Sequence, residues 1–507
     1  MKLNSQPFRR RLLSALLCLS LLAGLFALTG CDHLPWDKKP VAVTYPFVFV
    51  HGLNGSGENG GSINYWGSTA GNLLPSLREA GFSCVAPTLS LAGSAWDEAC
   101  ELYAQLCGGR VDYGKAHSEK YGHDRFGETY ATPLVPGWGT EDANGNLVKI
   151  NLVGHSFGGA VVRTLLNLLA NGSPAEQAAL PPVTTMKAVK AKNKNNTDTT
   201  VPAPLEESAL SPLFEGGKGS WVFSLTALAS PHNGTSALAI LDANSTFSGL
   251  ANLLDMTGLS GVSSLVGLLG QFDFTGLLGS LADAGLMRSG GQSLEEIKAA
   301  LQTGDNAYYD LSIPGAEALN ATMGAPLPGV YYFSLPVDGT EDSLSGNRSG
   351  GSDMSWFLRP LATVIGSYRK DLVGSQVIDA RWLPNDGLVN TISATAPFRE
   401  PSAEWDPAQA PVPAYDPENF HYKDYADQLP AAAQWNIFPT LRGDHGTPIG
   451  MSKTLDWTRQ FYLDFMKRID ELSKIDTGTW SRNRPVPAAA PVSATDPVSA
   501  DPSAVSP

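Results

Sequence analysis

The chain has 507 residues, of which 43% are hydrophobic and only 17% are charged. This composition supplies enough apolar side chains for a large core and excludes a chain that is disordered throughout. The 35 Lys and Arg residues against 49 Asp and Glu give a formal net charge of −14, which excludes a broad basic surface for nucleic acid.

The start of the chain predicts an export signal. A basic segment precedes an uncharged apolar run over residues 12–28, and Thr29-Gly30-Cys31 follows. Small residues directly before a cysteine resemble the cleavage site of bacterial lipoproteins. We expect residues 1–30 to be a signal peptide, Cys31 to carry acyl chains, and residues 31–44 to form a linker. The protein would then be an exported bacterial lipoprotein, membrane-anchored and facing the periplasm or the cell surface, with partial secretion as an alternative. The alternatives are a plain signal peptide or an uncleaved anchor helix, for which the apolar run is short.

Of the five cysteines, Cys18 lies in the predicted signal peptide and Cys31 is the predicted acylation site. The other three allow at most one intramolecular disulfide in an exported protein. Cys100 and Cys107 are seven residues apart in a stretch with a helical pattern, residues 96–106. Seven helical steps span about 10 Å, which is too far for a disulfide. A bridge from Cys84 to either residue and three buried free thiols are both compatible with the sequence.

Apolar runs alternate with helical patterns along the chain. Residues 47–50 and 150–153 predict buried parallel strands, and residues 160–170 predict an apolar helix after the second one. Residues 221–228 and 330–335 predict two further strands. This alternation predicts an α/β fold with a mostly parallel central sheet flanked by helices.

Three segments read as insertions into one domain spanning residues 45–475. Residues 189–207 are polar and predict a surface loop, and residues 397–430 are rich in proline. Residues 238–286 are rich in Leu, Gly and Ser and carry four acids, which is compatible with a helical lid or with ordinary core helices. Residues 476–507 are rich in proline and alanine and predict a disordered tail.

A nucleophile is predicted in Gly154-His155-Ser156-Phe157-Gly158, which fits the G-x-S-x-G pattern. The pattern alone is common, but here it lies where an apolar strand ends and an apolar helix begins. In such a sharp turn the glycines relieve crowding, and the helix N-terminus lies beneath a developing oxyanion. We therefore assign Ser156 as the nucleophile.

A serine nucleophile needs a base, and the base needs an orienting acid. In this fold the acid comes between the serine and the histidine along the chain. If the acid also lies well beyond Ser156, two of the eight histidines remain, namely His421 in proline-rich sequence and His445 in a tight turn before a predicted amphipathic helix, residues 455–472. We favour His445 because a turn can aim the imidazole. Asp386 precedes Gly387 and is a candidate acid, although an Asp-Gly pair is by itself typical of a simple turn.

Five ordered motifs resemble the large thermoalkalophilic secreted bacterial lipases, which are true triacylglycerol lipases on an α/β-hydrolase fold. The likeness extends roughly over residues 45–472. The motifs are His51-Gly52-Leu53-Asn54-Gly55, Gly154-His155-Ser156-Phe157-Gly158, Ser230-Pro231-His232-Asn233-Gly234-Thr235, Asn385-Asp386-Gly387-Leu388-Val389-Asn390 and Asp444-His445.

The resemblance implies roles for particular residues. The family's catalytic positions match Ser156, Asp386 and His445, and its oxyanion donors match the backbone N–H groups of Leu53 and Phe157. Leu53 stands where the family usually has Phe, which does not affect a backbone donor but alters the wall of the acyl pocket.

The resemblance also implies a structural zinc ion held by two Asp and two His. Asp97, His117 and His123 match three of the ligands, and Asp283 in the apolar insertion is the candidate for the fourth. Without the family, these residues would be read as surface polar groups. The family's two acidic calcium ligands correspond here to Thr447 and Ser452, so we expect that the calcium site is lost.

Together these features predict a serine carboxylic-ester hydrolase that acts on water-insoluble esters, most specifically triacylglycerol. The alternatives are a polyester, phospholipid or short-chain esterase, or an inactive lipid-binding surface lipoprotein on the same fold. The intact order of Ser, Asp and His argues against the inactive alternative.

Overall fold

The computed structural model describes residues 45–476 apart from residues 59–63, 143–144, 181–187, 193–197, 203–207, 244–303, 357, 399–429 and 452. The predicted signal peptide, Cys31, the linker, the tail and nearly all of the predicted lid and proline-rich insertion therefore lie outside the described residues.

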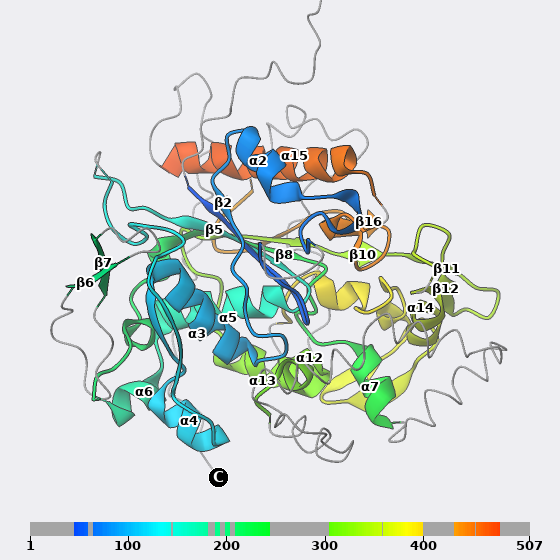
Figure 1. The fold of residues 1–507 in the computed structure, drawn as a ribbon. Helices are drawn as coiled ribbons and strands as arrows, with labels where there is room; N and C mark the ends of the chain where they lie inside the picture. Colours follow the sequence, from blue (N-terminus) through cyan, green and yellow to red (C-terminus); the bar gives the residue numbers. More distant parts are fainter. Residues whose placement is uncertain are drawn as a thin grey trace, which may run out of the picture.

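A six-stranded parallel sheet forms the centre of the molecule (Figure 1). Its strands, in spatial order, are β15 (Trp435–Ile437), β9 (Tyr331–Leu335), β8 (Val222–Leu228), β5 (Ile150–His155), β1 (Phe47–Val50) and β2 (Cys84–Val85). Four of these match strands predicted from sequence. The strand β2 lies on one side of β1, and β5, the next strand of the sheet along the chain, lies on the other side. At such a change in strand order, the carboxyl ends of the parallel strands open a crevice.

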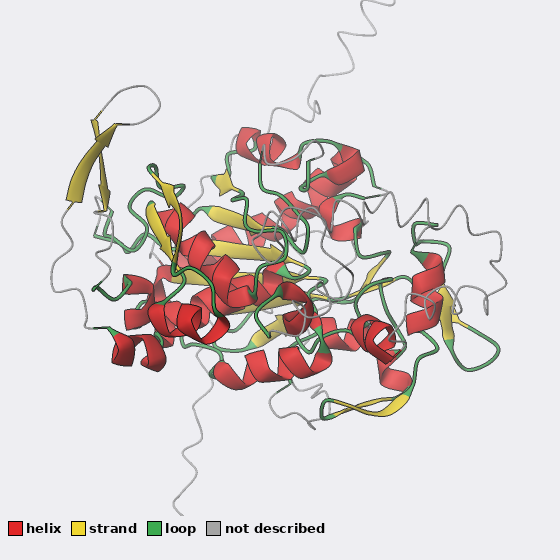
Figure 2. Cartoon of the chain, turned by 60° about the horizontal axis from the view of Figure 1, so that its bottom comes forward, coloured by secondary structure: helices red, strands yellow, loops and turns green. Residues whose placement is uncertain are grey.

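Helices cover both faces of the sheet, as the red helices around the yellow central strands show in Figure 2. Helices α2 (Leu73–Glu79) and α15 (Leu455–Asp476) lie together on one face, and α3 (Ala95–Cys107) and α5 (Gly158–Asn171) lie on the other (Figure 1). The helices predicted at residues 96–106, 160–170 and 455–472 are thus confirmed.

Each face of the sheet has its own hydrophobic core. Val48, Leu152 and Leu165 belong to the core between the sheet and α5, whereas Phe49 and Tyr462 belong to the core between the sheet and α15. Strand β5 contributes to both cores, and each of its residues is buried. A strand buried on both faces is expected to be mostly apolar, and Asn151, a buried polar residue within β5, is hydrogen-bonded to Tyr45 and Ser224.

The described residues form six further α-helices. They are α4 (Lys115–Tyr121), α6 (Pro174–Ala179), α7 (Ser236–Ala243), α12 (Ala307–Leu311), α13 (Ile313–Thr322) and α14 (Arg359–Ile365).

The other strands form small two-stranded pairs. The antiparallel pairs are β3 (Gly109–Asp112) with β4 (Phe126–Tyr130), β6 (Ala188–Lys192) with β7 (Asp198–Pro202), β11 (Thr340–Asp342) with β12 (Arg348–Gly350), and β13 (Lys370–Val373) with β14 (Gln376–Ile378). Strand β10 (Val337–Asp338) pairs in parallel with β16 (Leu441–Arg442).

The prediction of a surface loop at residues 189–207 is wrong in part, because β6 and β7 pair there as an antiparallel hairpin. The reason lies in the sequence of β7, in which two threonines and a valine favour strand over loop.

The structure also decides between the alternatives for the cysteines. Cys84, Cys100 and Cys107 are free thiols, and the first two are buried. Among the described residues, no helix has the length and apolar character needed to cross a membrane.

Candidate functional site

Ser156 lies in the turn between β5 and α5, at the carboxyl end of a central strand. Its backbone has φ of +56°, a left-handed conformation that is unusual for a residue other than glycine. The turn is tight: a Cβ at Gly154 would lie 2.4 Å from the carbonyl oxygen of Gly158, and one at Gly158 would lie 2.4 Å from that of Val50. Glycine is therefore required on both sides of the serine, as the pattern predicted.

Asp386 and His445 are hydrogen-bonded to each other although 59 residues separate them in the chain. Nδ1 of His445 lies 2.8 Å from Oδ2 of Asp386. The other carboxylate oxygen of Asp386 accepts hydrogen bonds from the backbone N–H groups of Leu388 at 3.0 Å and Val389 at 2.7 Å. The Asp-Gly turn thus does more than reverse the chain, because it buries a fixed carboxylate against the imidazole.

The turn that carries His445 is held by the residue before it. One oxygen of the buried Asp444 carboxylate accepts from the backbone N–H of Gly446 at 3.1 Å, and the other accepts from the N–H of Ser355 at 2.8 Å. The hydroxyl of Thr447 accepts from the N–H of Asp444 at 3.0 Å. Thr447 corresponds to one of the calcium ligands of the large thermoalkalophilic lipases, and here its hydroxyl is hydrogen-bonded within the turn. Ser452, which corresponds to the other ligand, lies outside the described residues.

Two backbone N–H groups next to Ser156 are free to bind an oxyanion. Within the described part of the chain, neither the N–H of Leu53 nor that of Phe157 donates a hydrogen bond. Phe157 immediately precedes the first residue of α5, where unpaired N–H groups and the helix dipole favour negative charge. The loop after β1 lies directly against the serine, since a Cβ at Gly52 would be 2.7 Å from Cβ of Ser156.

The serine and the imidazole come from neighbouring turns. The ring centroid of His155, the residue before Ser156, lies 4.9 Å from that of His445. Among the described residues, Oγ of Ser156 forms no hydrogen bond. His421, the alternative base, lies outside the described residues.

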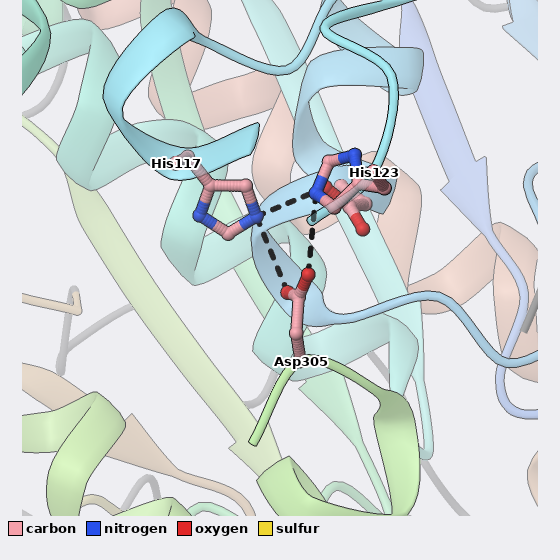
Figure 3. A group of neighbouring side chains, drawn as sticks. His117, His123 and Asp305 are labelled. Atoms are coloured by element: carbon pink, nitrogen blue, oxygen red, sulfur yellow. Dashed lines mark ion pairs between the residues drawn. The ribbon is translucent and has the colours of Figure 1, made fainter. Parts of the chain in front are cut away.

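A second polar group lies apart from Ser156, at the start of α3 and around α4. It consists of Asp97, His117, His123 and Asp305, whose ligand atoms all lie within 4.8 Å of one another. Nε2 of His117 is 3.3 Å from Oδ1 of Asp97 and 3.2 Å from Oδ1 of Asp305, and Nε2 of His123 is 3.3 Å from Oδ2 of Asp305. Figure 3 shows both imidazoles and Asp305 turned toward one another.

This geometry fits a tetrahedral zinc ion. Ligands about 2.1 Å from a tetrahedral zinc are separated from one another by about 3.4 Å, close to the three distances of 3.2 Å and 3.3 Å given above. Oδ1 of Asp97 and Nε2 of both histidines are buried and make no hydrogen bond among the described residues. Nδ1 of His123 lies 2.9 Å from the carbonyl oxygen of Asp124, which leaves Nε2 as the unprotonated atom of the neutral ring.

The electrostatic surroundings of these four side chains also favour the binding of a positive charge. Burial opposes a positive charge on His117, but the carboxylates of Asp305 and Asp97 outweigh it and raise its pKa to about 9. The indole of Trp96 stacks on the His117 ring with centroids 4.9 Å apart. The imidazole is thereby held in one orientation toward the two acids.

The fourth member of this group differs from the sequence expectation. Asp283, the predicted fourth ligand, lies outside the described residues, and the position is taken by Asp305, directly before the N-cap residue of α12. Sequence reasoning missed Asp305 because its side chain meets the others only in three dimensions. Its one local signal is the pair Asp305-Asn306 before a helix, which reads as a cap.

Comparison with known proteins agrees with this fold. The family model for the lipase-like C-terminal domain matches residues 43–180 and 191–410. The chain belongs to this lipase family. The lipase of Staphylococcus hyicus is 31% identical over 418 residues, which cover 80% of this chain and 53% of that relative. The chain spans about half the length of the curated relatives it matches.

Solved structures at similar identity share the fold of this family member. The structure of EstA from Clostridium botulinum matches with a TM-score of 0.61 and 29% identity, covering 86% of this chain and 90% of that one. The structure of lipase 1 from Pelosinus fermentans matches with a TM-score of 0.59 and 32% identity, covering 85% of this chain and 99% of that one. The fold is therefore the α/β-hydrolase fold that the sequence predicted.

Proposed function

We propose that this lipase-family member is a serine carboxylic-ester hydrolase in which Ser156, Asp386 and His445 form the catalytic triad. The observation that carries the proposal is the 2.8 Å hydrogen bond between Asp386 and His445, formed beside the strained turn that exposes Ser156. The order of motifs along the chain further supports a place with the large thermoalkalophilic lipases.

The proposed reaction needs only groups of this chain. Oγ of Ser156 attacks the ester carbonyl while Nε2 of His445 takes its proton. Asp386 holds the imidazole in the tautomer with hydrogen on Nδ1 and stabilises the imidazolium. The N–H groups of Leu53 and Phe157 bind the oxyanion. The tetrahedral intermediate expels the alcohol, which receives the proton from His445, and water then hydrolyses the acyl-enzyme by the same steps.

The proposed substrates are water-insoluble esters, most specifically triacylglycerol. Membership of the lipase family supports this class of substrate. The relative from Staphylococcus hyicus and the solved structure from Pelosinus fermentans, which match over most of this chain, are both named lipases. A polyester, phospholipid or short-chain ester would use the same triad. Chain-length preference depends on the wall of the acyl pocket, to which Leu53 contributes.

We further propose that Asp97, His117, His123 and Asp305 hold a structural zinc ion. Such an ion would join the start of α3 to the segment before α12 and supply folding free energy, because metal binding stabilises the folded state alone. It has no part in the proposed ester chemistry, for which the triad suffices. Loss of the family's calcium site remains a prediction.

We also propose that the mature protein begins at Cys31 and is anchored by acyl chains through residues 31–44. The support is the cleavage-site pattern before Cys31. The predicted boundaries, with the hydrolase domain at residues 45–475 and a tail at 476–507, belong to the same proposal.

The deciding experiment measures hydrolysis of p-nitrophenyl esters from short to long acyl chains and of emulsified triacylglycerol. We expect the wild type to hydrolyse them and Ser156→Ala to lose nearly all activity with an unchanged melting temperature. A fluorophosphonate probe should label the wild type at Ser156 and leave Ser156→Ala unlabelled. Folded wild-type protein that is neither active nor labelled would establish the inactive lipid-binding alternative.

A further inference from the structure

A series of buried and partly buried hydrogen bonds connects the loop after β1 with the turn that carries His445. The hydroxyl of Tyr65 accepts from the backbone N–H of Gly52 at 2.8 Å and lies 2.6 Å from Nδ1 of His155. On the other side of the same imidazole, Nε2 of His155 lies 2.9 Å from the carbonyl oxygen of His445. The side chains of Tyr65 and His155 thus join the loop after β1, the turn after β5 and the turn that carries His445.

The direction of each bond follows from the chemistry of the end groups. A carbonyl oxygen can only accept, so Nε2 of His155 must carry hydrogen and donate to His445. In a neutral ring, Nδ1 is then an acceptor. The hydroxyl of Tyr65 accepts from Gly52 and has one hydrogen, which it donates to Nδ1. Each donor and acceptor in the series has one partner.

Burial keeps the Tyr65 hydroxyl and the His155 imidazole neutral, so each hydrogen bond of the series has one possible direction. Burial lowers the pKa of His155 well below its usual value, and the neighbouring His445 lowers it further. Burial also raises the pKa of Tyr65. A second proton on the His155 ring would place two donors against each other at Nδ1, which the geometry disfavours.

The peptide group that follows Gly52 is fixed from its other side. Nδ1 of His51 lies 2.9 Å from the carbonyl oxygen of Gly52, and Nε2 of His51 accepts from the N–H of Leu89 at 2.9 Å. The carbonyl of Gly52 and the N–H of Leu53 belong to one planar peptide. Holding Gly52 at both its N–H and its carbonyl therefore sets the direction of the Leu53 N–H.

We infer that Tyr65 and His155 are positioning residues that fix the Leu53 oxyanion donor relative to the imidazole of His445. The inference rests on the proposed function, since it assigns these two groups to the ester hydrolysis described above. Neither side chain touches the ester. They act by holding the loops, and a displacement of about 1 Å in such a constellation lowers the rate about 100-fold.

The test uses Tyr65→Phe, His155→Phe, His155→Gln and the double variant Tyr65→Phe/His155→Phe in the full chain. We expect Tyr65→Phe to lower kcat by about 10- to 100-fold with little change in KM. The double variant should be no worse than His155→Phe, because either substitution breaks the same series. His155→Gln, which keeps one donor and one acceptor, should retain more activity than His155→Phe.

A matched control is Tyr332→Phe. The Tyr332 hydroxyl likewise accepts from a backbone amide, the N–H of Leu327 at 2.9 Å, but the contact lies outside this series. We expect its kcat to stay within about twofold of wild type. A wild-type kcat in Tyr65→Phe, or a double variant whose loss equals the product of the single losses, would overturn the inference.

A measurement on the resting protein separates this inference from the proposed function. Two-bond ¹⁵N–¹H NMR of the histidine rings should show the Nε2–H tautomer for His155 in the wild type, and a changed Nδ1 shift in Tyr65→Phe. The Nδ1–H tautomer in the wild type would overturn the series even if the enzyme is active. Absence of esterase activity with the expected spectrum would refute the function and leave the hydrogen-bonded series established.

Discussion

Asp386 and His445 are joined by two hydrogen bonds, one between side chains and one between backbones. Besides the contact of Nδ1 with Oδ2 at 2.8 Å, the N–H of His445 donates to the carbonyl oxygen of Asp386 at 2.9 Å. One bond alone would let the ring rotate or the turn slide. With both, the loop that bears the acid fixes the position and the orientation of the imidazole.

His445→Ala is expected to lower kcat by at least about 1000-fold, because the nucleophile then has no base. His421→Ala is the matched control, and its activity should stay within about twofold of wild type. Steady-state hydrolysis of a p-nitrophenyl ester measures both. An inactive His421→Ala together with an active His445→Ala would show that the base is misassigned.

Asp386→Asn should lower kcat about 100- to 10,000-fold while KM changes little, because an amide no longer stabilises the imidazolium and favours the wrong tautomer. Asp379→Asn changes an exposed acid near the same loop and serves as control. Kinetics across pH 6–9 will compare them. Equal activity of the two variants would exclude Asp386 from the triad.

Removal of the proposed zinc ion should lower the melting temperature before it lowers activity at room temperature, because such an ion would stabilise the folded state without taking part in the proposed chemistry. Elemental analysis of protein purified without added metal is expected to give one zinc per chain. Asp305→Asn should lose the zinc and Asp283→Asn should keep it. Zinc loss in Asp283→Asn with retention in Asp305→Asn would restore the ligand set predicted from the sequence.

Cys31→Ser should release the protein from membranes without changing the specific activity of the purified enzyme, because the acyl chains attach far from Ser156 in the sequence. Membrane flotation after expression in a bacterial host measures the partitioning, and Cys84→Ser controls for the loss of a thiol. If Cys31→Ser still floats with membranes, residues 12–28 or another surface hold the protein there.

His51 should make the protein sensitive to acid. Burial lowers its pKa from 6.5 to about 4, so the folded state holds the ring neutral where the unfolded state binds a proton. Its contribution to stability is complete above pH 6.5 and falls by about 1 kcal/mol per pH unit as the pH drops toward 4. The difference in unfolding free energy between wild type and His51→Gln should therefore shrink from pH 7 to pH 5. Urea unfolding measures it, and a constant difference, as expected for Tyr332→Phe, would contradict the assignment.

Features encoded in consecutive residues could be predicted from the sequence. The strand at residues 47–50 has the predicted bounds, and the turn around Ser156 follows because glycine is needed where a Cβ would meet a carbonyl oxygen. The hairpin at residues 188–202 was missed, because the polar composition of residues 189–207 outweighed the β-branched residues within it.

Contacts between distant segments could not be read from the sequence. Asp305 lies next to His117 only because the segment before α12 packs against α4, and no spacing rule relates the two positions. In the sequence, His155 is a variable residue of the G-x-S-x-G pattern, and no local pattern distinguishes Tyr65. Their partnership depends on two loops meeting at the end of the sheet, which a pattern along one chain does not record.

The burial of β5 on both faces has a consequence for how the enzyme would lose activity. The left-handed backbone of Ser156 costs about 1–3 kcal/mol, and this strain persists only while the strand before it and the helix after it stay in place. A central strand between two cores opens only when the whole domain unfolds, so its amide hydrogens should be among the slowest to exchange with solvent. Ser156 thus belongs to the last cooperative unit to open, and gradual fraying at the edges of the domain would leave its turn intact.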